Sequence, residues 1–154
     1  MPTQEGLKIP LIFTPATSAK DLKKIYEYTI DAFSDTPDFS WKLEDLKAEM
    51  KDGWEIFGAT NDEEDIVAAA FTKIDGDTLY TKNTGLKIHH QGSGYSHQIK
   101  EFFEHMARKL KLKYIVHYCR IDNFRMYSLN ESHGYVKTDN KSADGQVVEW
   151  RKKL

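Results

Sequence analysis

The residues of this chain best suited to hold a ligand are Gln91-Gly92-Ser93-Gly94-Tyr95-Ser96. They stand between a strand-like run at 78–88 and a segment of helical periodicity at 97–110. Two glycines in three residues allow a tight turn whose backbone N–H groups point at one spot. With the positive end of a helix dipole behind them, such groups favour an anion, above all a phosphate. The alternative interpretation is a glycine turn that binds nothing.

Apolar periodicity and turn residues predict the elements that position this loop. We expect strands at 8–14, 54–60, 66–74, 78–88, 113–119, 135–138 and 147–151. We expect helices at 19–33, at 41–51 after a Ser40 cap, at 97–110, and at 123–133 ahead of Gly134.

This order of elements predicts one α/β domain (α+β in some schemes) over residues 1–154, with a loose tail at 1–6. The sheet is expected to be mixed and mostly antiparallel, with about seven strands and about four flanking helices. One β-α-β crossover is expected at the glycine loop, at the carboxyl end of a strand, where open sheets usually bind ligands. Strand 113–119 should be buried on both faces. The crossover helix should turn Lys100 to solvent and bury its apolar side chains, Ile99, Phe102, Phe103, Met106 and Leu110.

The composition is that of a globular protein without a strong basic field. Of the 154 residues, 40% are hydrophobic and 30% are charged, and the net charge is −2. This balance argues against nucleic acid or an anionic membrane as a partner. The single cysteine, Cys119, excludes an internal disulfide and fits a reducing compartment. No signal-peptide pattern is present and no apolar run reaches the roughly 20 residues that span a bilayer, so we expect a cytoplasmic protein.

A second motif lies on the last expected helix. Its residues are spaced Asn-x-x-Met-x-x-x-Asn-x-x-x-Gly-Tyr, from Asn123 through Met126 and Asn130 to Gly134-Tyr135. This motif and the loop pattern Gln-x-x-Gly-x-Gly/Ala, with serine in the last position here, resemble two signatures of the GNAT superfamily of acyl-CoA-dependent N-acyltransferases. Thr84-Gly85-Leu86 and Ile99-Lys100 resemble one branch of that family. The element order is similar over most of the chain.

The resemblance implies acetyl-CoA as acyl donor. The backbone amides of residues 92–96 would hold the pyrophosphate, and Gln91 would add a side-chain donor where most relatives carry Arg. The backbone of Leu86, Lys87 and Ile88 would pair with the pantetheine amides. Nearby cations could offset the missing arginine charge or could simply be a solvated surface: Lys87, His89, His90, His97 and Lys100.

The resemblance also implies which residues would contact the cofactor arm and transfer protons. Asn123, Met126 and Asn130 share one helical face and would contact the cofactor arm, unless Asn123 is only the helix N-cap. Asn130 occupies the position at which many relatives have a tyrosine that acts as the acid. Tyr127, one turn earlier, is therefore the candidate general acid; the alternative is a core or groove tyrosine. His117 and Glu55 are candidate bases, each with a structural alternative. No spacing typical of metal ligands occurs, so we expect no metal.

The acceptor is expected between the first two helices and the last hairpin. Acidic residues there would suit a cationic amine or polyamine, although a solvated helix face explains them equally: Asp31, Asp35, Asp38, Glu44 and Asp45. Aromatic residues could line the same pocket or belong to the core: Tyr28, Phe33, Phe39 and Trp41. The resemblance therefore implies an N-acetyltransferase, monomeric or homodimeric, with an unidentified amine acceptor. The alternative is a catalytically silent acyl-CoA-binding regulatory module.

Overall fold

The computed structural model describes residues 10–29, 42–87 and 90–154, and the chain divides into two compact units. The first unit contains residues 1–70 and 83–98, and the second contains residues 71–82 and 99–154. Seven strands are hydrogen-bonded in the order β1-β2-β3-β4-β5-β7-β6. The α/β class and the mixed seven-stranded sheet are thereby confirmed, and the single-domain organisation stays a prediction. Within the described ranges, no helix has the length and apolar character that crossing a bilayer requires.

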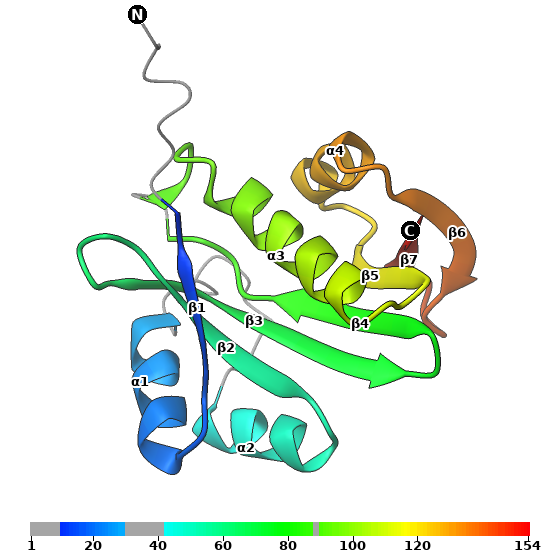
Figure 1. Ribbon diagram of the computed structural model, residues 1–154. Helices are drawn as coiled ribbons and strands as arrows, with labels where there is room; N and C mark the ends of the chain where they lie inside the picture. The colour runs from blue at the N-terminus through cyan, green and yellow to red at the C-terminus, as the bar shows by residue number, and fades with distance from the viewer. Residues whose placement is uncertain (1–9, 30–41, 88–89) are drawn as a thin grey trace, which may run out of the picture. The chain divides into compact units, whose positions relative to one another are not determined.

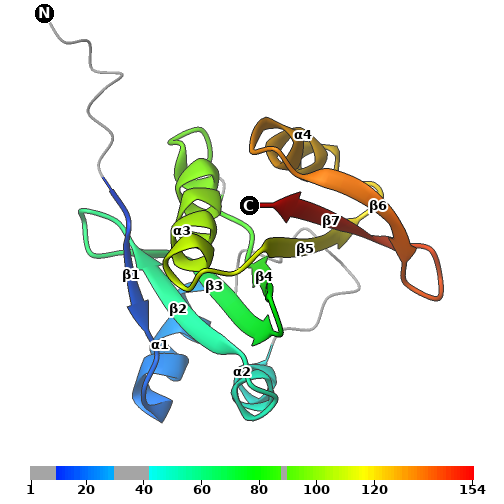
Figure 2. The same ribbon diagram turned by 45° about the vertical axis from the view of Figure 1, so that its right-hand side comes forward.

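The first unit begins with strand β1 (Ile12–Pro15), helices α1 (Ala19–Thr29) and α2 (Leu43–Lys51), and strand β2 (Glu55–Thr60). Strand β1 pairs antiparallel with β2, with Ile12 opposite Thr60. Helix α1 contacts α2, which contacts β2, and both helices lie below these strands in Figures 1 and 2. A Cβ atom on Gly58 would lie 3.3 Å from Cγ1 of Ile25, so the missing side chain lets α1 approach the sheet closely.

Strand β3 (Ile66–Asp75) begins in the first unit and continues into the second. Ala68, Ala69 and Ala70 are fully buried, as expected where small side chains permit close packing against a sheet. A short turn joins β3 to strand β4 (Thr78–Asn83), at the break expected between the strands predicted at 66–74 and 78–88.

Strand β4 ends five residues earlier than predicted, and Thr84 is the reason. The Thr84 N–H donates to the Ala69 carbonyl at 3.0 Å, as in a strand. The Ala69 N–H, however, donates to the Thr84 hydroxyl at 2.8 Å instead of to a backbone carbonyl. A side-chain acceptor thus replaces the next ladder bond, and Gly85, Leu86 and Lys87 lie outside any strand.

Replacing Thr84 with valine should therefore destabilise the protein by about 1–3 kcal/mol, because the buried Ala69 N–H loses its acceptor. Urea denaturation measures the change. Thr84→Ser keeps the hydroxyl and is the matched control. Equal stabilities of the valine and serine variants would contradict this account of the junction.

The second unit contains β4, most of helix α3 (Tyr95–Lys109), strand β5 (Tyr114–Arg120), helix α4 (Phe124–Ser132) and strands β6 (Val136–Lys141) and β7 (Val147–Lys153). Strands β4 and β5 are parallel, so the predicted crossover through α3 is confirmed. Strand β7 pairs antiparallel with β5 on one side and with β6 on the other, and Figure 2 shows it between them. The turn between β6 and β7 is closed by Gly145 N–H, which donates to the Ser142 carbonyl.

Several predicted boundaries are wrong. Strand β1 starts at Ile12, later than predicted, and the strand runs only four residues. Helix α2 has Lys42 as its N-cap, whose N–H donates to the Asp45 carboxylate. The predicted cap Ser40 and the last turn predicted for α1, residues 30–33, lie outside the described residues. Strand β5 is not buried on both faces, since Tyr118 is 46% exposed.

The inward face of α3 also differs from the prediction. Ile99 and Phe103 are buried as expected, but Leu110 is 47% exposed. Lys100, predicted to point to solvent, is only 2% exposed. The buried stripe therefore runs through Lys100, Phe103 and Ala107, at i, i+3 and i+7.

Candidate functional site

The loop before α3 has the backbone that an anion cradle needs. Gly92 and Gly94 have φ angles of +83° and +80°, in the left-handed region that side chains disfavour. A Cβ atom built on either glycine would meet nothing within 4 Å, so both positions face open space. The glycines are therefore required by the conformation of the loop and not by crowding.

Helix α3 begins at Tyr95, two residues before the predicted start, so its positive end lies immediately behind the two glycines. The first N–H groups of a helix have no acceptor within the helix. No acidic side chain lies in the first turn of α3 to compete for them. Tyr95 and Ser96 are half-buried there, while Gln91, Gly92 and Ser93 are exposed. This end of α3 can therefore attract an anion through its dipole and its backbone donors.

The loop is closed by its own hydrogen bonds. Nε2 of Gln91 donates to the Leu86 carbonyl at 3.1 Å, and the His90 N–H donates to the Lys87 carbonyl at 2.9 Å. The Gln91 side chain thus links the two ends of the loop by a hydrogen bond in this structure. Leu86 and Lys87 are half-buried, and Ile88 and His89 lie outside the described residues.

The second motif lies on α4. The Asn123 side chain accepts a hydrogen bond from the Met126 N–H at 3.1 Å, so Asn123 is the N-cap of this helix. Met126 is half-buried, and Asn130 is fully buried with no hydrogen-bond partner for its side chain among the described residues. Gly134, with φ of +82°, follows the C-cap His133 as predicted.

Tyr127 is half-buried on α4 among other rings. Its ring packs edge-on against Trp150 at a centroid distance of 5.0 Å and against Phe124 at 5.9 Å. Nζ of Lys137 lies 5.6 Å from the centroid of the same ring. Desolvation raises the pKa of Tyr127, and the Cys119 and Asp122 charges act in the same direction, so the hydroxyl keeps its proton at neutral pH.

The two candidate bases differ in their surroundings. His117 is buried on β5, where burial and then the charge of Lys100 hold its pKa well below the usual value, so it is neutral and a weak proton acceptor. Glu55 begins β2 in the first unit and is exposed. The environment of His117 is therefore not that of a base tuned to operate near pH 7.

From the sequence, the burial of one residue was missed and another residue was not singled out. One is Lys100, which shares a helical stripe with Phe103 and Ala107; the small residue at i+7 was the available signal. The other is Glu149 on β7, which is 8% exposed and accepts from Thr138 Oγ1 at 2.7 Å, Asn140 Nδ2 at 2.8 Å and the Tyr118 hydroxyl at 3.3 Å. No Lys or Arg in the described part of the chain forms an ion pair with Glu149.

The residues predicted to receive the acceptor are only partly described. Asp31, Asp35 and Asp38 lie outside the described residues, as do the aromatics Phe33, Phe39 and Trp41. Glu44 and Asp45 form the first turn of α2, where Asp45 accepts from the Lys42 N–H. Tyr28 is partly exposed on α1. Asp45 therefore has a structural use as a helix cap.

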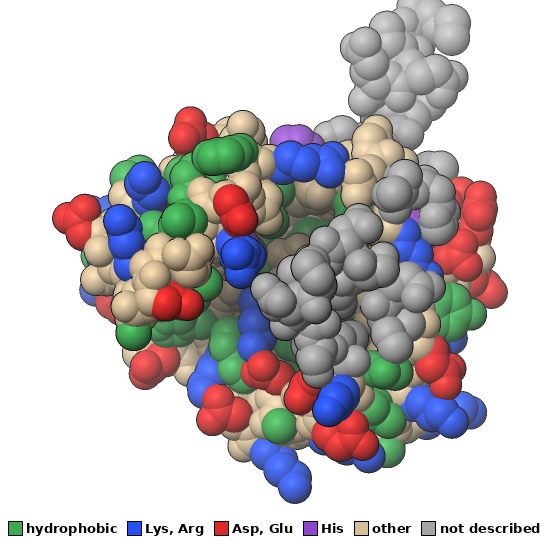
Figure 3. Space-filling view, turned by 180° about the vertical axis from the view of Figure 1, so that it is seen from behind, with side chains coloured by type: hydrophobic (Ala, Val, Ile, Leu, Met, Phe, Trp, Pro, Cys, Tyr) green, Lys and Arg blue, Asp and Glu red, His purple; other side chains and the backbone are tan. Residues whose placement is uncertain are grey.

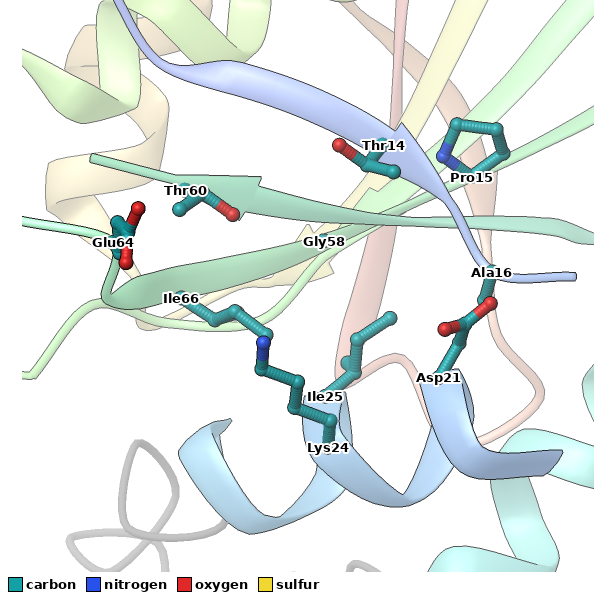
Figure 4. A pocket seen from close by; sticks show the side chains of 10 residues that line it. All are labelled: Thr14, Pro15, Ala16, Asp21, Lys24, Ile25, Gly58, Thr60, Glu64 and Ile66. Atoms are coloured by element: carbon teal, nitrogen blue, oxygen red, sulfur yellow. The ribbon is translucent and has the colours of Figure 1, made fainter. Parts of the chain in front are cut away.

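The first unit also contains a hollow of about 380 Å³ between β1, α1 and β2. Figure 4 shows the Lys24 side chain rising from α1 toward Ile66, while Ile25 extends from the same helix toward the strands on the other side. The Asp21 carboxylate at its rim accepts from the Thr17 N–H at 2.9 Å, and this bond lowers the pKa of Asp21. The Asp21 carboxylate at the rim of the hollow is therefore already hydrogen-bonded to the residues that begin α1. Across the described ranges, no group of three or more His, Cys, Asp or Glu side chains could hold a metal ion.

Comparison with solved structures identifies the fold. The PaiA N-acetyltransferase of Thermoplasma acidophilum, solved in complex with coenzyme A, superposes with a TM-score of 0.74 at 16% identity, covering 93% of this chain and 99% of that chain. The ribosomal-protein-S18-alanine N-acetyltransferase of Escherichia coli gives 0.72 at 16% identity, covering 93% and 94%. The spermidine/spermine N-acetyltransferase of Vibrio cholerae gives 0.71 at 13%, covering 93% of each chain. No protein-family model and no curated protein sequence matches. The chain therefore has the fold of the GNAT N-acetyltransferases.

Proposed function

We propose that this protein is an N-acetyltransferase that transfers an acetyl group from acetyl-CoA to a primary amine. The observation that carries the proposal is the open glycine loop at the N-terminus of α3, in a chain whose fold is that of known N-acetyltransferases. The amides of residues 92–96 would bind the pyrophosphate, with Gln91 holding the loop closed and Leu86, Lys87 and Ile88 beside the pantetheine arm. Met126 and Asn130 would contact the arm from α4, which Asn123 caps.

The reaction would be a direct attack of the neutral amine on the thioester carbonyl in a ternary complex. The amine nitrogen forms the new C–N bond, the C–S bond breaks, and the thiolate takes up a proton. Tyr127, whose raised pKa keeps it protonated, would supply that proton. His117 is neutral and enclosed, so it is poorly suited to abstract the amine proton. A water molecule or Glu55 would take the proton of the ammonium form first, so that the amine attacks in its neutral form.

Tyr127→Phe tests the acid. We expect turnover to fall about 100-fold with little change in KM for acetyl-CoA, because only the proton donor is lost. Steady-state release of free thiol measures both constants. Phe124→Leu, which alters the neighbouring ring on the same helix, is the control for packing. Unchanged turnover in Tyr127→Phe would remove this residue from the mechanism.

The acceptor would be an amine with a positive charge. Glu149 supports this, since a buried carboxylate without a paired cation attracts one, and Tyr118 beside it is partly exposed. The protein is further proposed to act in the cytoplasm, as a monomer or homodimer, without nucleic acid or membrane partners. In support, the net charge is −2, and basic and acidic side chains are intermingled on the face drawn in Figure 3.

Two measurements test the proposal. Coenzyme A should raise Tm, since a ligand at 100 times its Kd stabilises the native state by about 2.7 kcal/mol. Acetyl-CoA with a panel of monoamines, diamines and lysine peptides should release free thiol. Stabilisation without turnover on any amine would favour the catalytically silent acyl-CoA-binding module. Absence of any shift in Tm would refute both functions.

A further inference from the structure

The side chain of Lys100 is buried in the second unit without a counter-ion. It projects from α3 and is 2% exposed, and its Nζ has no hydrogen-bond partner among the described residues. Nζ lies 4.4 Å from the centroid of the Tyr135 ring, whose face offers only a weak attraction to a cation. A buried ammonium that lacks a partner costs several kcal/mol, so it is seldom retained for stability.

The carboxylate best placed to neutralise Lys100 is already engaged. Glu104 lies one turn further along α3, at i+4, where a Lys–Glu pair would form on an isolated helix. Its carboxylate instead accepts a hydrogen bond from Lys152 on β7 and pairs with Arg108. Lys152 also donates to the His133 carbonyl at 2.6 Å and so ties β7 to the end of α4. This arrangement leaves the Lys100 charge uncompensated by its own helix.

Three further residues of the second unit have buried polar side-chain atoms without partners. His117 Nδ1, the Tyr135 hydroxyl and both polar atoms of the Asn130 side chain are buried and make no hydrogen bond within the described ranges. Asn130 and Tyr135 are joined at the end of α4, where the Tyr135 N–H donates to the Asn130 carbonyl at 2.9 Å. His117 is close enough to Lys100 for its pKa to be lowered by that charge. These four residues, named here the Lys100 cluster, offer mainly hydrogen-bond donors.

We propose that the Lys100 cluster is a buried subsite for a small anionic group, bound by the Lys100 ammonium and the neutral donors of Tyr135, Asn130 and His117. One source of that group is a free monovalent anion such as chloride. The other is the thiolate of coenzyme A, and this second assignment rests on the proposed function. The bound anion would neutralise the Lys100 ammonium.

The pKa of Lys100 can be used to detect an anion bound in the cluster. Burial, opposed only by the Cys119 charge, lowers the pKa of Lys100 to about 7. The titratable groups that interact with it are His117 and Cys119 on β5 and Tyr135 after α4. The Glu104 carboxylate, paired with Lys152, acts in turn on Tyr135. An anion in the cluster favours the charged forms of Lys100 and His117, so both pKa values should rise by about one unit or more.

The experiment is an NMR titration of Lys100 Nζ and the His117 ring nitrogens in the full chain between pH 5 and 9. Chloride is compared with sulfate at equal ionic strength, and coenzyme A is compared with desulfo-coenzyme A, which lacks the thiol. If the two pKa values rise with chloride alone, the ligand of the subsite is a free anion. If they rise with coenzyme A but not with its desulfo analogue, the ligand is the thiolate. If neither raises the two pKa values, the subsite is refuted.

Variants separate this subsite from the cofactor loop. Lys100→Met should abolish the response of His117 to chloride or thiol while leaving the stabilisation by desulfo-coenzyme A unchanged. Lys109→Met removes an exposed lysine of the same helix. It should change neither the response of His117 nor the stabilisation by desulfo-coenzyme A. A normal His117 response in Lys100→Met would overturn the proposal. If no coenzyme A compound stabilises the wild-type protein, the proposed function fails, and the chloride comparison still decides the subsite.

Discussion

The double variant Gly92→Ala/Gly94→Ala will bind coenzyme A at least 30-fold more weakly than the wild-type protein and will remain folded. Both glycines have φ near +80°, where a side chain costs about 1–2 kcal/mol per residue. Relaxation to negative φ turns the N–H groups of the loop away from their common focus. A loss of about 2–4 kcal/mol corresponds to roughly 30- to 1,000-fold in Kd.

The folded state should tolerate this change because nothing lies within 4 Å of a Cβ atom at either position. Isothermal titration calorimetry gives Kd, and circular dichroism confirms that the variant is folded. Gly145→Ala is a matched control: its φ is +71°, it also faces open space, and it lies in the β6–β7 turn. Wild-type affinity in the double variant would show that this loop does not hold the pyrophosphate.

The second large effect concerns stability. Lys100→Met should stabilise the protein, since methionine is similarly long and apolar and removes a buried charge. The pKa of Lys100 is lowered from 10.5 to about 7, and each unit is worth about 1.4 kcal/mol, so the upper limit of the gain is roughly 5 kcal/mol.

The pH dependence follows from the direction of this shift. Below about pH 7 the side chain is charged in both the folded and unfolded states, and folding bears the full cost of burying it. Between pH 7 and 10.5 only the unfolded state holds the proton, so wild-type stability rises with pH through this window. The gain from Lys100→Met should therefore be largest below pH 7 and should disappear toward pH 10.5.

Urea denaturation of both proteins at pH 6 and pH 10 measures this difference. Lys109→Met, which removes an exposed charge from the same helix, should give no comparable gain at either pH. A gain of the same size at both values would mean that packing, and not charge burial, causes it. If the Lys100→Met protein is more stable and its His117 no longer responds to chloride or thiol, then Lys100 serves the function of the protein at a cost in stability.

The sequence was sufficient for features that depend on local chemistry. The strand and helix order follows from apolar period and turn residues, which act over a few positions. Gly92, Gly94 and Gly134 were predicted at turns and helix ends, and each has positive φ. Asn123 was correctly assigned as a possible N-cap, because capping needs only the helix that it begins.

The failures occur where distant parts of the chain decide the outcome. Residues Ile99 and Lys100 both lie near the buried side of α3, and only the packing of β5 and Tyr135 determines that the lysine is enclosed. The end of β4 depends on a Thr84 hydroxyl that reaches Ala69, fifteen positions earlier. Glu149 was overlooked because its three donors come from two other strands, β5 and β6.

The position of β7 between β5 and β6 has a consequence for the order of folding. The β6–β7 hairpin joins neighbouring segments through a short turn fixed by Ser142, Asp144 and Gly145, so closing it costs little chain entropy. Pairing of β7 with β5 spans a much longer stretch of chain that includes α4. We therefore expect the hairpin to form first and to dock on β5 as one piece, with the Lys152 contacts to Glu104 and the end of α4 made only after the rate-limiting step.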